Sequence, residues 1–304
     1  MIALVLALLT FVASPTGAQN IVCDNVSPEL RTFGLVTDTL VTKLGSSGYP
    51  GEPWGTSIYR RACTRRGKMA ATGIYPLFVA TETAASAMRF THGTIAGSTC
   101  WNWVDGDLVT GGGTITGIDP ECTDGIVDTT GTHPAVADCN QAFIDRQTAS
   151  EFFASRPVDR ELGSITIAAF DTYTLALAPN EVVHIDSLEV KGGYDPEFPL
   201  LCYDYTNLDI TGGPAVVNLD RLEIGPCVLV DTPAAAVILN LPGSGHTIKI
   251  GRGAIVPAPI LAPGRTVTVR GTLDDGITFI GSTFARRLKM TGLSSLEHPF
   301  PSCP

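Results

Sequence analysis

Short β-type segments recur through residues 163–292, and they constrain the fold more than any other feature of the sequence. Stretches such as 164–168 (SITIA), 236–241 (AVILNL) and 265–269 (RTVTV) follow at intervals of 10–20 residues, with Gly, Pro, Asp or Asn at almost every join. Such segments form β-sandwiches, β-barrels or coils of parallel strands. The 32 Gly, 21 Pro and 16% charged residues suit short strands and tight turns. We therefore predict an all-β fold.

One segment departs from this pattern and predicts a helix over residues 140–155. Ala142, Phe143, Ala149 and Phe153 fall near one helical stripe. Asn140 or Asp138 is a candidate cap at its start, and the Arg-Pro pair at 156–157 would end it. Its length suits a helix that lies along the face of a sheet.

The N-terminus has the features of a secretory signal peptide, which we place at residues 1–18. An apolar, uncharged run over residues 2–13 is followed by the small residues at 16–18. The run is shorter than the roughly 20 apolar residues that span a bilayer. A buried N-terminal strand or helix is the alternative. No later segment is apolar for long enough to cross a membrane, so we expect a secreted, extracellular protein with no transmembrane segment in the mature chain.

Secretion changes how the cysteines are interpreted. An even number in an oxidising compartment indicates disulfides, and their pairing stays open. No two cysteines form a C-x-x-C pair, which argues against a zinc ribbon or a redox motif. Asn25 begins an Asn-x-Ser acceptor site for glycosylation, although Pro28 follows the serine. The disulfide candidates are Cys23, Cys63, Cys100, Cys122, Cys139, Cys202, Cys227 and Cys303.

Composition divides the mature chain into three regions. Residues 19–75 are rich in Cys, Gly and Pro, residues 76–292 hold the strands and the helix, and residues 293–304 form a tail. We expect the first and last regions to cover the ends of the fold, because exposed ends of a sheet invite edge-to-edge pairing. The basic run at 60–68 (RRACTRRGK) is interpreted as a surface loop pinned by its cysteine. A dibasic processing site or a contact for acidic polysaccharide are the alternatives.

A family resemblance decides between the β architectures. The stretch 259–268 (PILAPGRTVT) resembles the signature of choice-of-anchor A domains, and 276–285 (GITFIGSTFA) fits the strand that follows it there. The resemblance covers about residues 140–292. It implies a bacterial-type surface protein built on coiled β-strands, similar in outline to an ice-binding β-solenoid with a helix along one side. We therefore expect a β-solenoid-like (parallel β-helix) fold with one long helix packed alongside, and a β-sandwich as the alternative.

The residues that usually carry chemistry do not form a recognisable catalytic or metal motif. The five histidines are far apart, no Gly-x-Ser-x-Gly elbow occurs, and we expect no cofactor and no metal. Acidic pairs are the remaining candidates for a carbohydrate-active enzyme, which needs two facing carboxyl groups. Turn-forming aspartate is the simpler interpretation. The pairs are Asp105 with Asp107, Asp204 with Asp209, and Asp274 with Asp275.

These observations favour a non-enzymatic, secreted or cell-surface structural or adhesion protein. The alternative is an ice-binding or carbohydrate-binding protein that uses a flat solenoid face. Trp101 and Trp103 would share one face of a strand and are candidate carbohydrate contacts. Thr-x-Thr pairs at 114–116, 172–174 and 266–268 are too far apart in sequence for adjacent rungs. Expected partners are cell-wall or matrix polysaccharide or a second copy, and the net charge of −10 argues against nucleic acid.

Overall fold

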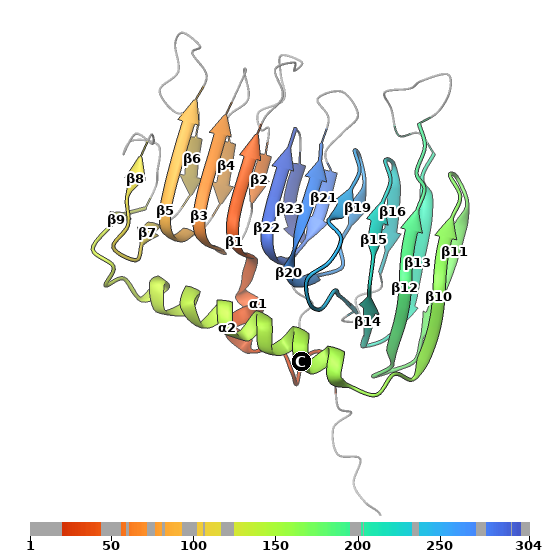
Figure 1. The fold of residues 1–304 in the computed structure, drawn as a ribbon. Helices are drawn as coiled ribbons and strands as arrows, with labels where there is room; N and C mark the ends of the chain where they lie inside the picture. The colour runs from red at the N-terminus through yellow and green to blue at the C-terminus, as the bar shows by residue number, and fades with distance from the viewer. Residues whose placement is uncertain are drawn as a thin grey trace, which may run out of the picture.

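The described part of the chain forms two parallel β-sheets and two helices (Figure 1). No helix among the described residues is both long and apolar enough to cross a membrane. The signal peptide expected at residues 1–18 lies outside the described part. The computed structural model describes residues 20–43, 56–58, 61–71, 77–80, 83–92, 102–105, 107–116, 125–194, 202, 204–232, 237–271, 278–292 and 294–298.

Within these ranges sheet A has fourteen strands and sheet B has nine. The helices are α1 (Pro28–Thr32) and α2 (Pro134–Ser155). Sheet A holds β1 (Phe33–Lys43), β3 (Arg61–Ala71), β5 (Thr83–His92), β7 (Leu108–Thr110), β8 (Ile115–Thr116), β9 (Val127–Asp128), β10 (Arg160–Ile167), β12 (Val182–Val190), β14 (Ala215–Leu219), β15 (Leu222–Ile224), β17 (Val237–Asn240), β18 (Ile248–Ile250), β20 (Ile260–Arg270) and β22 (Thr283–Thr291). Sheet B holds β2 (Thr56–Ile58), β4 (Leu77–Ala80), β6 (Asn102–Asp105), β11 (Thr172–Leu177), β13 (Thr206–Gly212), β16 (Val228–Asp231), β19 (Ile255–Val256), β21 (Thr278–Gly281) and β23 (Ser294–His298).

The chain passes repeatedly from sheet A to sheet B and back, with some sheet A passages split into two short strands such as β14 and β15, so it winds as a β-solenoid. β20 and β21 belong to one coil, and β22 and β23 belong to the next. Each strand pairs in parallel with the equivalent strand of the neighbouring coil. A β-sandwich is built from antiparallel pairs, whereas these pairs are parallel. The predicted β-solenoid with one helix alongside is confirmed.

The coils do not stack in sequence order. β1 pairs with β22, so the chain begins in the middle of the solenoid, and the N-terminal coils run outward to β9. Helix α2 then runs back along the solenoid, and β10 starts at the opposite end (Figure 1). From there the chain winds back until β22 meets β1. Two halves that are far apart in sequence therefore meet side by side.

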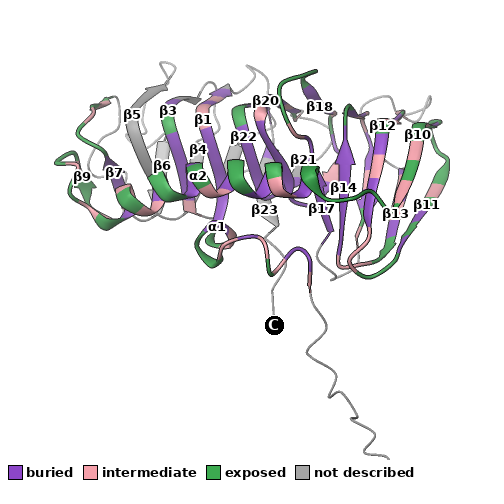
Figure 2. Ribbon diagram, turned by 60° about the horizontal axis from the view of Figure 1, so that its bottom comes forward, coloured by how far each residue is buried: buried purple, intermediate pink, exposed green. Residues whose placement is uncertain are grey.

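Side-chain burial explains why α2 lies on sheet A. The first core cluster fills the inside of the coils, with residues such as Val217, Leu239 and Leu288 fully buried. The second cluster joins the apolar side of α2 to outward-facing residues of sheet A, including Phe284. Figure 2 shows buried strands behind a helix that is exposed on its outer side. Each Å² of apolar surface buried along this contact contributes about 25 cal/mol of stabilisation, which holds the helix against the coils.

Helix α2 is longer than the predicted helix at its N-terminal end. It begins at Pro134 rather than residue 140, and the cap is His133, whose Nδ1 accepts a hydrogen bond from Ala135 N at 3.2 Å. Proline suits the first helical turn because its missing N–H is not needed there. The helix ends at Ser155, with Arg156 extended before a proline as expected.

The predicted division into cap, solenoid and tail is wrong for the described residues. β1, β2 and β3 lie within residues 19–75, yet they form central coils rather than an end cover. β23 lies in the expected tail and pairs with β21 and β2. The basic run is not a loop, because Arg61–Ala71 is a strand. Its inward positions hold small residues such as Ala62 and Thr64, both buried, so its alternation is weak in the sequence.

Candidate functional site

The outer face of sheet B is the most regular surface of the solenoid. Its nine strands follow a single path with no side pairing, whereas in sheet A several strands are split or pair off the path. Adjacent strands of a sheet lie about 4.8 Å apart, and alternate residues of one strand lie about 6.6 Å apart. Outward side chains on this face therefore form a two-dimensional array.

One register position runs across all nine strands, and we call it the outer row. Among residues with described side chains, Thr172 is exposed while Asn207, Leu229 and Ile255 are half-buried. The neighbours of Leu229 and Ile255 on either side in sequence, such as Val230, face the core. The backbone register continues the outer row through Phe279, Ser295, Ser57, Phe78 and Trp103. No residue of the outer row is charged.

Charged residues lie beside the outer row, two residues further along β13 and β16. There Thr174, Asp209 and Asp231 lie in register on β11, β13 and β16. Asn207 also approaches Thr172, with Nδ2 and Oγ1 3.5 Å apart. Along sheet B the described outward side chains are thus mainly hydroxyl, amide and aliphatic groups.

Sheet A is unsuitable as a comparable surface because helices cover part of it. α2 packs on β1, β3, β5, β7, β14, β17 and β20, which all belong to sheet A. Buried polar contacts fix that packing: Asn240 Nδ2 donates to Ser150 O at 3.1 Å and to Asn218 Oδ1 at 2.7 Å. Asn218 Nδ2 in turn donates to Phe153 O at 3.1 Å. No sequence pattern pointed to these asparagines, because they lie in apolar strands.

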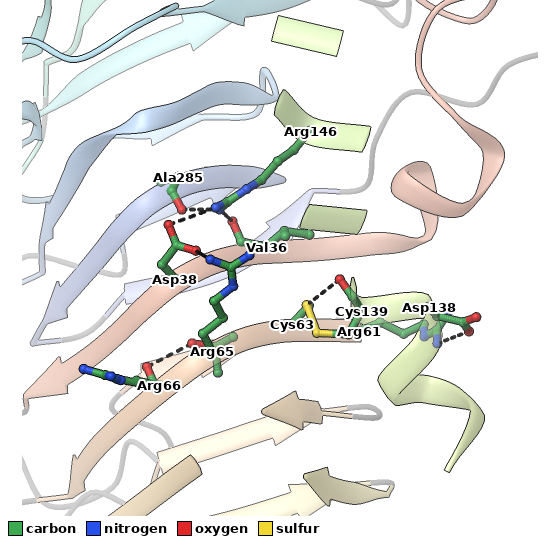
Figure 3. The surroundings of a disulfide bond; sticks show 11 residues. Val36, Asp38, Arg61, Cys63, Arg65, Arg66, Asp138, Cys139, Arg146 and Ala285 are labelled. Atoms are coloured by element: carbon green, nitrogen blue, oxygen red, sulfur yellow. Dashed lines mark hydrogen bonds and ion pairs between the residues drawn. A yellow bond between two sulfur atoms is a disulfide. The ribbon is translucent and has the colours of Figure 1, made fainter. Parts of the chain in front are cut away.

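The cysteines pair across elements rather than holding end covers. Cys63 of β3 is bonded to Cys139 of α2, 76 residues away (Figure 3). Cys202 is bonded to Cys227, 25 residues away. Cys23 is also disulfide-bonded. Cys63 therefore ties the helix to a central coil. Cys100, Cys122 and Cys303 lie outside the described residues.

The predicted contact residues fall at one end of sheet B or in the N-terminal segment. Trp103 lies in β6, in register with Phe78, and Trp101 is outside the described residues. Asn25 lines a shallow pocket with Phe152 and Arg156, and its Nδ2 donates to the carbonyl of residue 21 at 2.8 Å. Carbohydrate contact by the tryptophans and glycosylation of Asn25 stay predictions.

The structure describes the side chains of only some of the acidic candidates. Asp209 lies in register with Asp231 rather than beside Asp204. Asp107 accepts a hydrogen bond from the Ile126 N–H at 3.0 Å. Asp105 belongs to β6, and Asp274 and Asp275 lie outside the described residues.

His184 on β12 forms the one group that can hold a metal ion within the described residues. Its ring nitrogens lie 2.7 Å from Glu161, 3.9 Å from Asp186 and 3.5 Å from Asp220. His184, Asp186 and Asp220 bring their ligand atoms within 4.8 Å of one another. The hydrogen bond that His184 donates to the Glu161 carboxylate raises the pKa of His184, and Asp220 adds to this shift.

Comparison with known proteins gives structural neighbours only. No family model and no curated protein matches this chain. An ice-binding protein from the Antarctic ascomycete Antarctomyces psychrotrophicus is similar at 12% identity and a TM-score of 0.46, covering 92% of this chain and 100% of its own. A glycosylated ice-binding protein from an Arctic yeast is similar at 13% identity and a TM-score of 0.43, and the match covers 92% of this chain and 96% of the yeast protein. The Shewanella frigidimarina ice-binding protein 1 domain is similar at 13% identity and a TM-score of 0.36, and the match covers 88% of this chain and 94% of that domain.

Proposed function

We propose that this protein is a secreted, non-enzymatic ice-binding protein and that the outer face of sheet B binds the ice. The observation that carries the proposal is the outer row, a single uncharged register position that crosses nine parallel strands. The signal-like N-terminus and the disulfides support secretion.

Ice is a rigid and periodic lattice of neutral water molecules, so its binder needs a rigid and periodic surface. Strands about 4.8 Å apart provide a repeat close to that of water molecules in ice. The coils are fixed before binding by their buried core, so little conformational entropy is lost on contact. Hydroxyl and amide groups such as those of Thr172 and Asn207 share hydrogen-bonded water with the lattice.

Low charge favours sheet B over sheet A for this purpose. Charged groups hold their own hydration water strongly, and that water does not fit a lattice. The outward residues of β15, β18 and β22 on sheet A include Glu223, Lys249, Arg287 and Lys289. In sheet B the outer row avoids such residues. Aliphatic members such as Ile255 instead order the water next to them.

Substitution of Ile255 by arginine tests the proposal. The change places a bulky charge in the middle of the outer row without entering the core, because Ile255 faces outward from β19. We expect wild-type protein to show thermal hysteresis and Ile255→Arg to lose most of it. The matched control is Thr268→Arg, which changes a half-buried outward residue of β20 on sheet A.

Two outcomes would overturn the proposal. The first is a wild-type protein that neither produces thermal hysteresis nor enters growing ice. The second is an equal loss in both arginine variants, which would assign the effect to general damage rather than to sheet B. Circular dichroism spectra of both variants show whether each has kept its fold. Surface attachment, adhesion and membership of the choice-of-anchor A family stay predictions.

A further inference from the structure

Five cations on sheet A, which we call the basic band, have no role in the proposed ice-binding face. They are Arg270 of β20, Arg286, Arg287 and Lys289 of β22, and Arg66 of β3. All are exposed except Lys289, which is half-buried. The basic band therefore crosses the junction between the two halves of the chain, where β22 meets β1.

Register sets an even spacing within the basic band. Arg287 and Arg66 occupy the same register position, with Thr39 of β1 between them. Lys289 lies one outward position further along β22, beside Val41. Strands two apart are separated by about 9.6 Å. Cations thus alternate with uncharged residues across this part of the sheet.

The basic band differs from the rest of sheet A because its cations lack carboxylate partners. Among the described residues, no carboxylate lies within ion-pair distance of any of the five. Next to the basic band, at β15 and β18 of the same sheet, Glu223 pairs with Arg221 at 2.9 Å and with Lys249 at 3.1 Å. The chain has 30 acidic residues against 20 basic ones, so carboxylates are not scarce. Unpaired cations gathered on one face of an acidic protein indicate an anionic partner from outside the chain.

We propose that the basic band binds a linear carboxylated polysaccharide that lies across the strands, parallel to the solenoid axis. The surface is a sheet face with cations at wide and regular intervals, which suits a chain carrying its carboxylates at the spacing of sugar repeats. Duplex DNA carries one charge per about 1.7 Å, far denser than this array. Single strands are bound with stacking aromatics, and none of the described outward residues beside the basic band is aromatic.

Binding to sodium alginate tests this proposal, with uncharged dextran as the comparison. Arg66→Gln/Arg287→Gln is expected to weaken alginate binding at least about fivefold, because each exposed ion pair contributes modestly. The matched control is Arg221→Gln/Lys249→Gln, which removes the same charge from cations beside the basic band that Glu223 already neutralises, and it is expected to change binding less than about twofold. Raising salt from about 0.1 M to about 1 M shortens the screening length from about 10 Å to about 3 Å and should abolish binding.

Three results would overturn the proposal. These are equal binding of dextran and alginate, equal loss in the two double variants, and tighter binding of duplex DNA than of alginate. The ice assay keeps this inference separate from the proposed function. Arg66→Gln/Arg287→Gln is expected to keep its thermal hysteresis, and Ile255→Arg is expected to keep its alginate binding.

Discussion

Replacing Arg146 by methionine should loosen the junction where the two halves of the chain meet. Arg146 of α2 is buried, and its Nη1 donates to the carbonyl oxygens of Val36 on β1, at 2.9 Å, and of Ala285 on β22 (Figure 3). Its Nη2 lies 3.0 Å from Asp38. Burial lowers the pKa of Arg146, and Asp38 opposes that shift. An arginine nevertheless stays protonated at neutral pH, so this one side chain donates charged hydrogen bonds to both β1 and β22.

The expected loss follows from these contacts. A hydrogen bond to a charged group contributes about 1.5–3 kcal/mol, and two such bonds are lost. Methionine keeps the packing against Phe143, whose ring centre lies 4.6 Å from the guanidinium carbon. Asp38 keeps Arg65 at 3.3 Å. Relief of the buried charge offsets part of the loss, so we expect the free energy of unfolding to fall by about 3 kcal/mol.

Urea unfolding followed by circular dichroism measures this change. The matched control is Arg156→Met, which removes an exposed arginine just after the same helix and should cost less than about 0.5 kcal/mol. Hydrogen exchange should show the loss of protection concentrated at β1 and β22. The reasoning is refuted if Arg146→Met and Arg156→Met unfold at the same urea concentration, because strand pairing alone would then hold the junction.

Two further predictions concern the disulfides and pH. Cys63→Ala/Cys139→Ala should lower the free energy of unfolding by about 2–5 kcal/mol, and by about 1 kcal/mol more than Cys202→Ala/Cys227→Ala, because the first loop is longer. Equal melting temperatures for the two double variants would contradict the expected difference between them. The raised pKa of His184 stabilises the fold fully below the unfolded value of about 6.5, and this contribution is lost as pH rises through the folded pKa. Urea midpoints at about pH 5.5 and about pH 8.5 should therefore differ less for His184→Gln than for wild type.

The class of fold could be predicted from the amino-acid sequence. Short strands of Val, Ile and Thr between Gly and Pro turns indicated an all-β fold, because these side chains suit a pleated, half-buried surface, and the family resemblance favoured a coil. The apolar stripe with Phe143 and Phe153 predicted α2, and both residues are buried against sheet A. These features are local, so they can be recognised along the chain.

The order of the coils, in contrast, could not be predicted from the sequence. Any coil of matching cross-section can stack on another through parallel pairing, so nothing local shows that β1 joins β22. The strand in the basic run could not be predicted for a similar reason. Ala62 and Thr64 are small or polar, and only the stacking of neighbouring coils buries them. The outer row and the basic band each draw single residues from strands far apart in sequence. Both surfaces therefore exist only once the solenoid has wound.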